Sequence, residues 1–198
     1  MAKQLRVATD IGGTFTDIVY YEVDEAGAIA SVNVFKGHTT PSHLEQGVMA
    51  GIEEARRDVP HIDFFAHGTT IVINALTERK GVRTGLITTR GFRDVLEIGR
   101  GNRPDFFNFR FSKPSPFVPR YLRREVTERV THRGDIHTPL EIGALDDILE
   151  SFRAEGVEAI AICLLHAYAK PEHERTLLDQ VRRTWPEISV VASHQISR

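Results

Sequence analysis

The chain has 198 residues, of which 41% are apolar and 26% charged, and its 25 Lys and Arg are balanced by 27 Asp and Glu. Such a length and composition predict a globular protein with a sizeable core and exclude a disordered chain. The even charge argues against nucleic-acid binding, which usually needs a basic face. Lys3, Arg6 and Asp10 interrupt the apolar residues near the start. We therefore expect neither a secretory segment nor a membrane helix there.

Strand-like stretches and turn signals alternate at the beginning of the chain. β-Branched and apolar residues dominate 5–9, 18–23 and 30–35, and the segments 10–17 and 24–27 between them contain glycine and aspartate. This pattern predicts three strands in an antiparallel meander.

A helical pattern follows the meander. Leu44, Val48, Ile52 and Ala55 recur at a spacing of three or four residues, which predicts a helix that ends before Pro60.

The next stretches have a β-α-β rhythm. A short strand is predicted at residues 64–66, a helix over 71–79 and a strand at 84–88. This order favours a partly parallel sheet with helices packed on it.

Residues 99–120 break the rhythm. Four prolines in this segment forbid a regular element. So many aromatic side chains in a loop argue against free exposure, and we expect the loop to pack on another domain or subunit. The phenylalanines concerned are Phe106, Phe107, Phe109, Phe111 and Phe117.

The last part returns to alternating elements. We predict a strand over 124–131, an amphipathic helix over 141–153, a buried strand over 157–165, a helix that begins near Pro171 and a final strand over 188–192. The fold class is therefore α/β.

The chain has a single cysteine, Cys163, within an apolar run. A single cysteine excludes an internal disulfide, and its neighbours predict a small buried core residue. A reducing cytoplasm fits this best, and a reactive thiol is not expected.

The turn between the first two strands carries the clearest chemical signal. Gly12 and Gly13 remove Cβ atoms where the backbone approaches an anion, and they permit positive φ angles, so that successive N–H groups face phosphate oxygens. Thr14 and Thr16 add hydroxyl donors. The segment is therefore a candidate phosphate-binding turn.

Two carboxylates flank this turn. Asp10, directly before it, is placed to hold the water shell of a Mg²⁺ that bridges nucleotide phosphates. Asp17 either orders the turn or touches the metal, and the structural role is favoured. The alternative for the whole segment is an ordinary β-hairpin that needs no ligand.

A second polar constellation, residues 67–76, lies where a strand ends and a helix begins. Hydroxyl residues at a helix N-terminus cap the helix or bind a carboxylate or phosphate. We expect Thr69, Thr70 and Asn74 to face the cleft. The alternative is a capped helix with Asn74 on its surface.

A third constellation, residues 99–105, contains Arg100 and Arg103 in a glycine-containing loop. Guanidinium groups suit bidentate recognition of phosphate or carboxylate, so both arginines are candidate cleft residues. A solvated loop is the alternative.

The string at residues 10–17, Asp-Ile-Gly-Gly-Thr-Phe-Thr-Asp, resembles the first phosphate motif of the actin and sugar-kinase superfamily, and its full form resembles the hydantoinase A/oxoprolinase family. Residues 67–76, 79–81 and 89–94 are similar to the same family, so the resemblance spans most of the chain. Residues 101–108 and 113–114 look like subunits of acetone and acetophenone carboxylases.

The resemblance implies an actin-like (ribonuclease H-like) ATPase subdomain, with a mixed sheet flanked by helices. It implies ATP and Mg²⁺ as cofactors and the activation of an amide or ketone oxygen by phosphoryl transfer. Gly12, Gly13, Thr14 and Thr16 would hold phosphate, and Asp10 would order Mg²⁺ or the attacking group. The implied partners are a small amide or ketone substrate, the rest of the enzyme and a second subunit of hydantoinase B type.

Actin-like ATPases bind nucleotide between two related halves, and no second Asp-x-Gly turn is present here. We divide the chain into a phosphate-turn subdomain (1–95), a Pro/Phe-rich loop and strand (96–135) and an α/β remainder (136–198). The second half is expected to be absent, so that the fragment folds, binds ATP weakly and is inactive alone. A sugar or small-molecule kinase fragment and a non-catalytic assembly module remain alternatives.

Overall fold

The computed structural model describes residues 4–40, 42–55, 61–100 and 107–196. The chain forms two compact units, Met1–Lys80 and Gly81–Arg198. No helix in the described ranges has the length and apolarity that crossing a bilayer requires.

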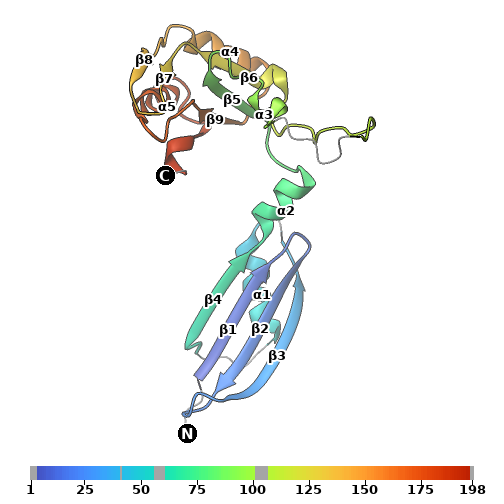
Figure 1. Ribbon diagram of the computed structural model, residues 1–198. Coiled ribbons are helices and arrows are strands. Elements are labelled where there is room, and N and C mark those ends of the chain that lie inside the picture. Colours follow the sequence, from blue (N-terminus) through green and yellow to red (C-terminus); the bar gives the residue numbers. More distant parts are fainter. Residues whose placement is uncertain (1–3, 41, 56–60, 101–106, 197–198) are drawn as a thin grey trace. The chain divides into compact units, whose positions relative to one another are not determined.

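The first unit is built on a mixed four-stranded sheet in the order β3-β2-β1-β4 (Figure 1). β1, β2 and β3 are antiparallel neighbours and β4 runs parallel to β1, so the predicted meander is confirmed. The strand bounds are β1 Gln4–Ile11, β2 Phe15–Val23, β3 Ile29–His38 and β4 Phe64–Thr69.

Helix α1, Leu44–Ala55, covers one face of this sheet (Figure 1). The buried residues Leu5, Val7 and Ile18 form the core beneath it. Gly51 of α1 lets the helix lie close, because a Cβ there would come within 2.5 Å of the Ile18 side chain. The alternation of buried and open residues along β1 is the period of two that a half-covered strand requires. Helix α2, Ile71–Glu78, follows β4 after one residue.

The second unit contains a parallel four-stranded sheet in the order β10-β9-β5-β6 and a small antiparallel hairpin, β7-β8. Its strands are β5 Thr84–Thr89, β6 Arg123–Val126, β7 Arg129–Val130, β8 Ile136–Thr138, β9 Ala159–Cys163 and β10 Ser189–Ala192. Its α-helices are α3 Val95–Ile98, α4 Leu145–Ala154 and α5 Glu172–Thr184, with 3-10 turns at Arg120–Leu122 and Ser193–Gln195.

The apolar faces of α4 and α5 form one core with this parallel sheet. Phe152 of α4 is fully buried. Gly85 of β5 gives its ring room, since a Cβ at that position would come within 2.8 Å of the ring. The apolar face of α4 can therefore pack closely on β5, because β5 has a glycine where the Phe152 ring lies.

Several expectations need correction. The strand expected over 124–131 is two strands, β6 and β7, and β7 pairs with β8, which was not predicted. The predicted helix over 141–153 begins only at Leu145. β5 was placed in a subdomain that ended at residue 95, but it pairs with β6 and β9 in the second unit.

The phenylalanine-rich loop exposes two aromatic side chains almost fully. Phe107 is 87% and Phe109 91% exposed in this chain, and the expected packing on another domain or subunit stays a prediction. Phe117 is exposed as well, and Phe106 lies outside the described residues.

Candidate functional site

The turn between β1 and β2 is closed by its own backbone. The amide of Gly12 donates to the carbonyl oxygen of Phe15 at 2.8 Å. A Cβ at Gly12 would lie 2.9 Å from that oxygen, so a glycine is needed for this close approach. The expectation of positive φ angles is wrong, because neither Gly12 nor Gly13 is among the residues with positive φ. Gly12 therefore serves the close packing of the backbone, and neither glycine adopts a conformation that only glycine favours.

The far side of this turn is open. Gly13 and Thr14 are exposed, and no acceptor within the described part of the protein takes their amide hydrogens. Asp10, the last open-face residue of β1, is also exposed. Its neighbour on β4 is Gly68, where a Cβ would make only an ordinary contact, at 3.8 Å, with the Asp10 carboxylate. Two amides without an acceptor, close in sequence to one exposed carboxylate, suit a phosphate with a Mg²⁺, an ion that prefers few protein ligands and several waters.

Asp17 has a partner of its own. It lies beside Asp10 in the β1-β2 register and forms an ion pair with Lys36 of β3 at 3.1 Å. The ammonium of Lys36 also lies 5.4 Å from the centroid of the Phe15 ring. These contacts support the structural interpretation of Asp17.

Thr16 is 1% exposed, and its hydroxyl lies 3.2 Å from the hydroxyl of Thr39, which follows β3. Thr39 in turn donates from its hydroxyl to the carbonyl of Gly12 at 3.0 Å and from its amide to the carbonyl of Thr14 at 3.0 Å. The structure thus places Thr16 behind the turn, and direct contact of its hydroxyl with phosphate stays a prediction.

The second constellation lies against the same turn. The amide of Thr70 donates to the carbonyl of Ile11 at 3.0 Å, and the hydroxyl of Thr69 donates to that oxygen at 3.3 Å. Asn74 donates to the Thr70 hydroxyl at 3.4 Å, and its amide nitrogen would lie 3.5 Å from a Cβ at Gly13. The start of α2 is therefore tied to the end of β1. Contact of these side chains with a ligand stays a prediction.

Two residues that support this site were not among the predicted site residues, although the second constellation begins at His67. Thr39 comes after a strand with no surrounding motif. His67 lies opposite Thr9 in the β1-β4 register, and its Nδ1 is 2.8 Å from the Thr9 hydroxyl. The pairing of β4 with β1 is a long-range contact that local sequence patterns do not show, so no sequence signal could have found this partner of Thr9.

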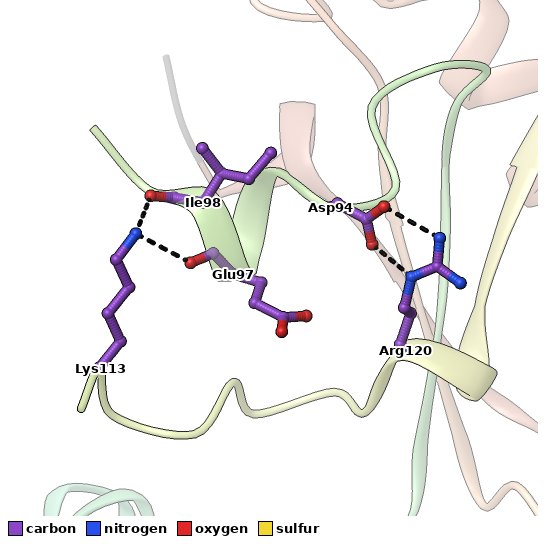
Figure 2. A pocket seen from close by; sticks show the side chains of 5 residues that line it. All are labelled: Asp94, Glu97, Ile98, Lys113 and Arg120. Atoms are coloured by element: carbon purple, nitrogen blue, oxygen red, sulfur yellow. Dashed lines mark hydrogen bonds and ion pairs between the residues drawn. The ribbon is translucent and has the colours of Figure 1, made fainter. Parts of the chain in front are cut away.

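The third constellation lies in the second unit. Arg100 is exposed, and Arg103 lies outside the described residues. Residues shortly before Arg100 in the sequence help to line a pocket of about 510 Å³ (Figure 2). It is lined by Asp94, Glu97, Ile98, Lys113 and Arg120.

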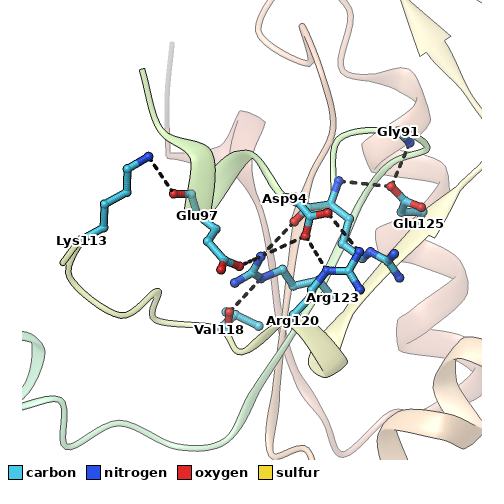
Figure 3. Close-up of polar contacts among 9 residues, drawn as sticks. Gly91, Asp94, Glu97, Lys113, Val118, Arg120, Arg123 and Glu125 are labelled. Carbon is cyan, nitrogen blue, oxygen red and sulfur yellow. Dashed lines mark hydrogen bonds and ion pairs between the residues drawn. The ribbon is translucent and has the colours of Figure 1, made fainter. Parts of the chain in front are cut away.

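The charged groups around this pocket are matched to one another (Figure 3). Arg120 donates two hydrogen bonds to Asp94, at 2.9 and 3.1 Å, which hold the pKa of that carboxyl below its usual value. The buried guanidinium of Arg123 contacts both Asp94 and Glu97. Lys113 donates to the carbonyl of Ile98 at 2.7 Å. These charged groups pair with one another or with backbone carbonyls, and their contacts hold the loop against α3. We therefore assign no ligand to the pocket.

Cys163 is exposed, so the expectation of a buried core residue is wrong. The isoleucines beside it in β9 point into the core, whereas Cys163 falls on the more open face. Nearby groups still exclude water from its thiol and raise its pKa; a hydrogen bond from Ser193 partly offsets this rise, and the carboxylate of Glu174 adds to it. The thiol is therefore a poor nucleophile near neutral pH, as expected. In the described residues, no group of three His, Cys, Asp or Glu is arranged to hold a metal ion.

Residues 6–185 match the model of the hydantoinase/oxoprolinase N-terminal region. The chain belongs to the hydantoinase/oxoprolinase family. Caprolactamase subunit alpha of Pseudomonas jessenii is 32% identical over 98% of this chain and 29% of its own length. The acetophenone carboxylase gamma subunit of Aromatoleum aromaticum is 31% identical over 94% of the chain and 28% of its own.

Two solved structures share this architecture. Nucleotide-free acetone carboxylase, an ATP-dependent enzyme, superposes with a TM-score of 0.80 at 27% identity, over 99% of this chain and 30% of its own. The ATP-dependent caprolactamase of Pseudomonas jessenii superposes with a TM-score of 0.76 at 32% identity, over 97% of this chain and 28% of its own. The mixed α/β fold is thus that of these enzymes, and the chain spans less than a third of each relative's length.

Proposed function

We propose that this chain supplies the first half of an ATP-binding site in an actin-like ATPase, in an enzyme that activates an amide or ketone oxygen. The observation that carries the proposal is the turn at residues 12–14. Its exposed amides at Gly13 and Thr14 have no acceptor in the described chain, and the exposed Asp10 comes shortly before them at the end of β1. The ATP dependence of caprolactamase and acetone carboxylase, both similar along nearly the whole chain, supports it.

In this proposal the residues of the chain bind and orient. The amides of Gly13 and Thr14 would receive phosphate oxygens, and Asp10 would hold the water shell of a Mg²⁺, which would neutralise phosphate charge. Bound ATP supplies a phosphoryl group whose transfer to an amide or enolate oxygen makes that oxygen a better leaving group. The protein mainly positions the reactants and neutralises charge. Thr69, Thr70 and Asn74 border the substrate side of the turn.

The site is proposed to be incomplete without further protein. Actin-like ATPases close over nucleotide with a second half, and this chain spans 29% of the caprolactamase subunit. The relatives named above are subunits, alpha and gamma, of larger enzymes. We therefore propose that the chain works with the remainder of the enzyme and with a second subunit of hydantoinase B type.

The test is substrate-dependent formation of phosphate from Mg-ATP by a protein extended past Arg198 together with its partner subunit. Cyclic amides, and ketones with bicarbonate, are offered separately. Phosphate release that rises with either class supports the proposal and names the class. Robust turnover by residues 1–198 alone would contradict the half-site, and phosphorylation of a sugar would favour the kinase alternative.

A second candidate, a non-catalytic assembly module, is favoured by one observation. Phe107 and Phe109 are almost fully exposed on a proline-rich loop, which is typical of a surface that another protein covers. Association with a partner chain that is insensitive both to nucleotide and to Asp10→Ala would support this reading. Loss of association in a Phe107→Ser, Phe109→Ser variant would locate the interface on the loop.

A further inference from the structure

We propose that Thr39 is a positioning residue of the phosphate turn, which aims the amide of Gly13 outward, and that Thr16 acts through it. The inference rests on the proposed function, because it explains how the turn keeps its amide donors free. It adds a residue outside the turn's own sequence and changes the role of one inside it.

The geometry of one peptide unit carries the first step. The carbonyl of Gly12 and the amide of Gly13 belong to the same peptide group, which is trans, as all described peptide bonds are. In a trans peptide the C=O and N–H point in opposite directions. The Thr39 hydroxyl holds the Gly12 carbonyl at 3.0 Å. Holding that oxygen inward therefore directs the N–H of Gly13 outward.

The backbone of Thr39 fixes the other side of the turn. Its amide donates to the carbonyl of Thr14 at 3.0 Å. One residue thus holds the carbonyls on both sides of the exposed amides of Gly13 and Thr14. β3 pairs with β2 up to His38, which lies opposite Phe15, so the next residue, Thr39, lies against the turn.

Counting hydroxyl hydrogens assigns the role of Thr16. A threonine hydroxyl has one hydrogen to donate, and a carbonyl oxygen only accepts. The Thr39 hydroxyl donates its hydrogen to the carbonyl of Gly12. In the hydrogen bond between the two hydroxyls, 3.2 Å apart, Thr16 must therefore be the donor and Thr39 the acceptor. Thr16 is 1% exposed and has no second hydrogen for a phosphate. It orients Thr39 and does not contact the ligand.

These linked hydrogen bonds, from Thr16 to Thr39 and from Thr39 to Gly12, preorganise the turn. Without the Thr39 hydroxyl, the Gly12–Gly13 peptide loses its inner partner and is free to rotate, and binding then has to restore the productive orientation. One hydrogen bond of this kind is worth about fivefold to tenfold in affinity. The effect falls on ligand binding more than on the fold, because Thr39 remains in place through its backbone.

Thr39→Val, Thr39→Ser and Thr40→Val separate these roles. Valine keeps the shape of threonine and removes the hydroxyl, and serine restores it. Thr40 is the matched control, because its hydroxyl donates to the carbonyl of His43 and accepts from the amide of Gly47, at the start of α1 and away from the turn. Two measurements are made on the protein extended past Arg198: the Gly13 amide resonance without ligand, and calorimetric titration with Mg-ATP.

We expect Thr39→Val to shift the Gly13 resonance and weaken Mg-ATP binding about fivefold to tenfold. Thr39→Ser should behave as wild type, and Thr40→Val should lower the melting temperature without either change. An unaltered Gly13 amide in Thr39→Val would overturn the inference, and so would an affinity loss no larger than that of Thr40→Val. If wild type ignores Mg-ATP, the proposed function fails, and the amide measurement still decides the role of Thr39.

Discussion

The amide of Gly12 donates to the carbonyl oxygen of Phe15 at 2.8 Å, so the turn between β1 and β2 is locked by a contact that leaves no room for a side chain. Thr39 and Asn74 approach the turn from two other elements, the end of β3 and helix α2. The turn is therefore rigid on its inner side and open on its outer side.

The first prediction concerns the two glycines. Gly12→Ala puts a methyl group 2.9 Å from the Phe15 oxygen, and the backbone must shift. We expect a loss of about 1–3 kcal/mol in the free energy of unfolding, as for other overpacked sites. In Gly13→Ala the nearest atom would be 3.5 Å away, an ordinary contact, and stability should be kept. Urea unfolding of both variants checks this; equal losses would contradict it.

Much of the first unit could be predicted from sequence because its signals are local. Period-two alternation in β1 and β2, glycine turns and the three-to-four spacing of α1 each specify one element. The register that brings β4 beside β1 is a long-range pairing, so the contact of Thr9 with His67 could not be predicted. No sequence pattern surrounds Thr39. Its hydroxyl has a role only because the fold brings it against the turn between β1 and β2.

The second unit was predicted less completely, for physical reasons. β7 and β8 together have five residues, too few for a periodic pattern. Cys163 lies in an apolar run typical of a strand covered on both faces, but only its isoleucine neighbours face the core. The coverage of a sheet is a tertiary property, and composition cannot reveal it.

The second prediction concerns Arg123, whose guanidinium is buried and donates to the carbonyl of Val118 at 2.9 Å. Arg123→Met should lower the free energy of unfolding by about 1.5–3 kcal/mol, the range for hydrogen bonds to charged groups. The control is Arg120→Met. That arginine pairs with Asp94 at the surface, where water replaces the lost partner, so a much smaller loss is expected. Thermal unfolding compares them, and equal losses would refute the distinction.

The third prediction is a pH dependence. Arg120 lowers the pKa of Asp94 below its ordinary value of 3.8. A lowered folded-state pKa means that this pair stabilises the protein above the ordinary value and stops doing so as pH falls through the lowered one. The stability difference between wild type and Asp94→Asn should therefore be constant near neutral pH and shrink below about pH 4. Denaturant titrations from pH 2 to 7 measure it, and a difference that grew with acid would be inconsistent.

The fourth prediction concerns the thiol of Cys163. Its pKa is raised, so less thiolate is present at a given pH than for an ordinary cysteine. Iodoacetamide should label the folded chain more slowly at pH 8 than the same chain in urea, where the thiol is hydrated. The chain has one cysteine, so the unfolded protein is its own control. Faster labelling of the folded chain would reveal an activated thiol and contradict this assignment.

The most direct test of the central claim is calorimetric titration with Mg-ATP of residues 1–198, of a protein extended past Arg198, and of its Asp10→Ala variant. Asp10 is exposed, so its replacement should leave the melting temperature unchanged. We predict that the extended protein binds Mg-ATP, that the 198-residue chain binds it weakly, and that Asp10→Ala lowers the affinity of the extended protein. An extended, folded protein that ignores Mg-ATP, or binds it equally well without Asp10, would contradict the phosphate-binding role of the turn.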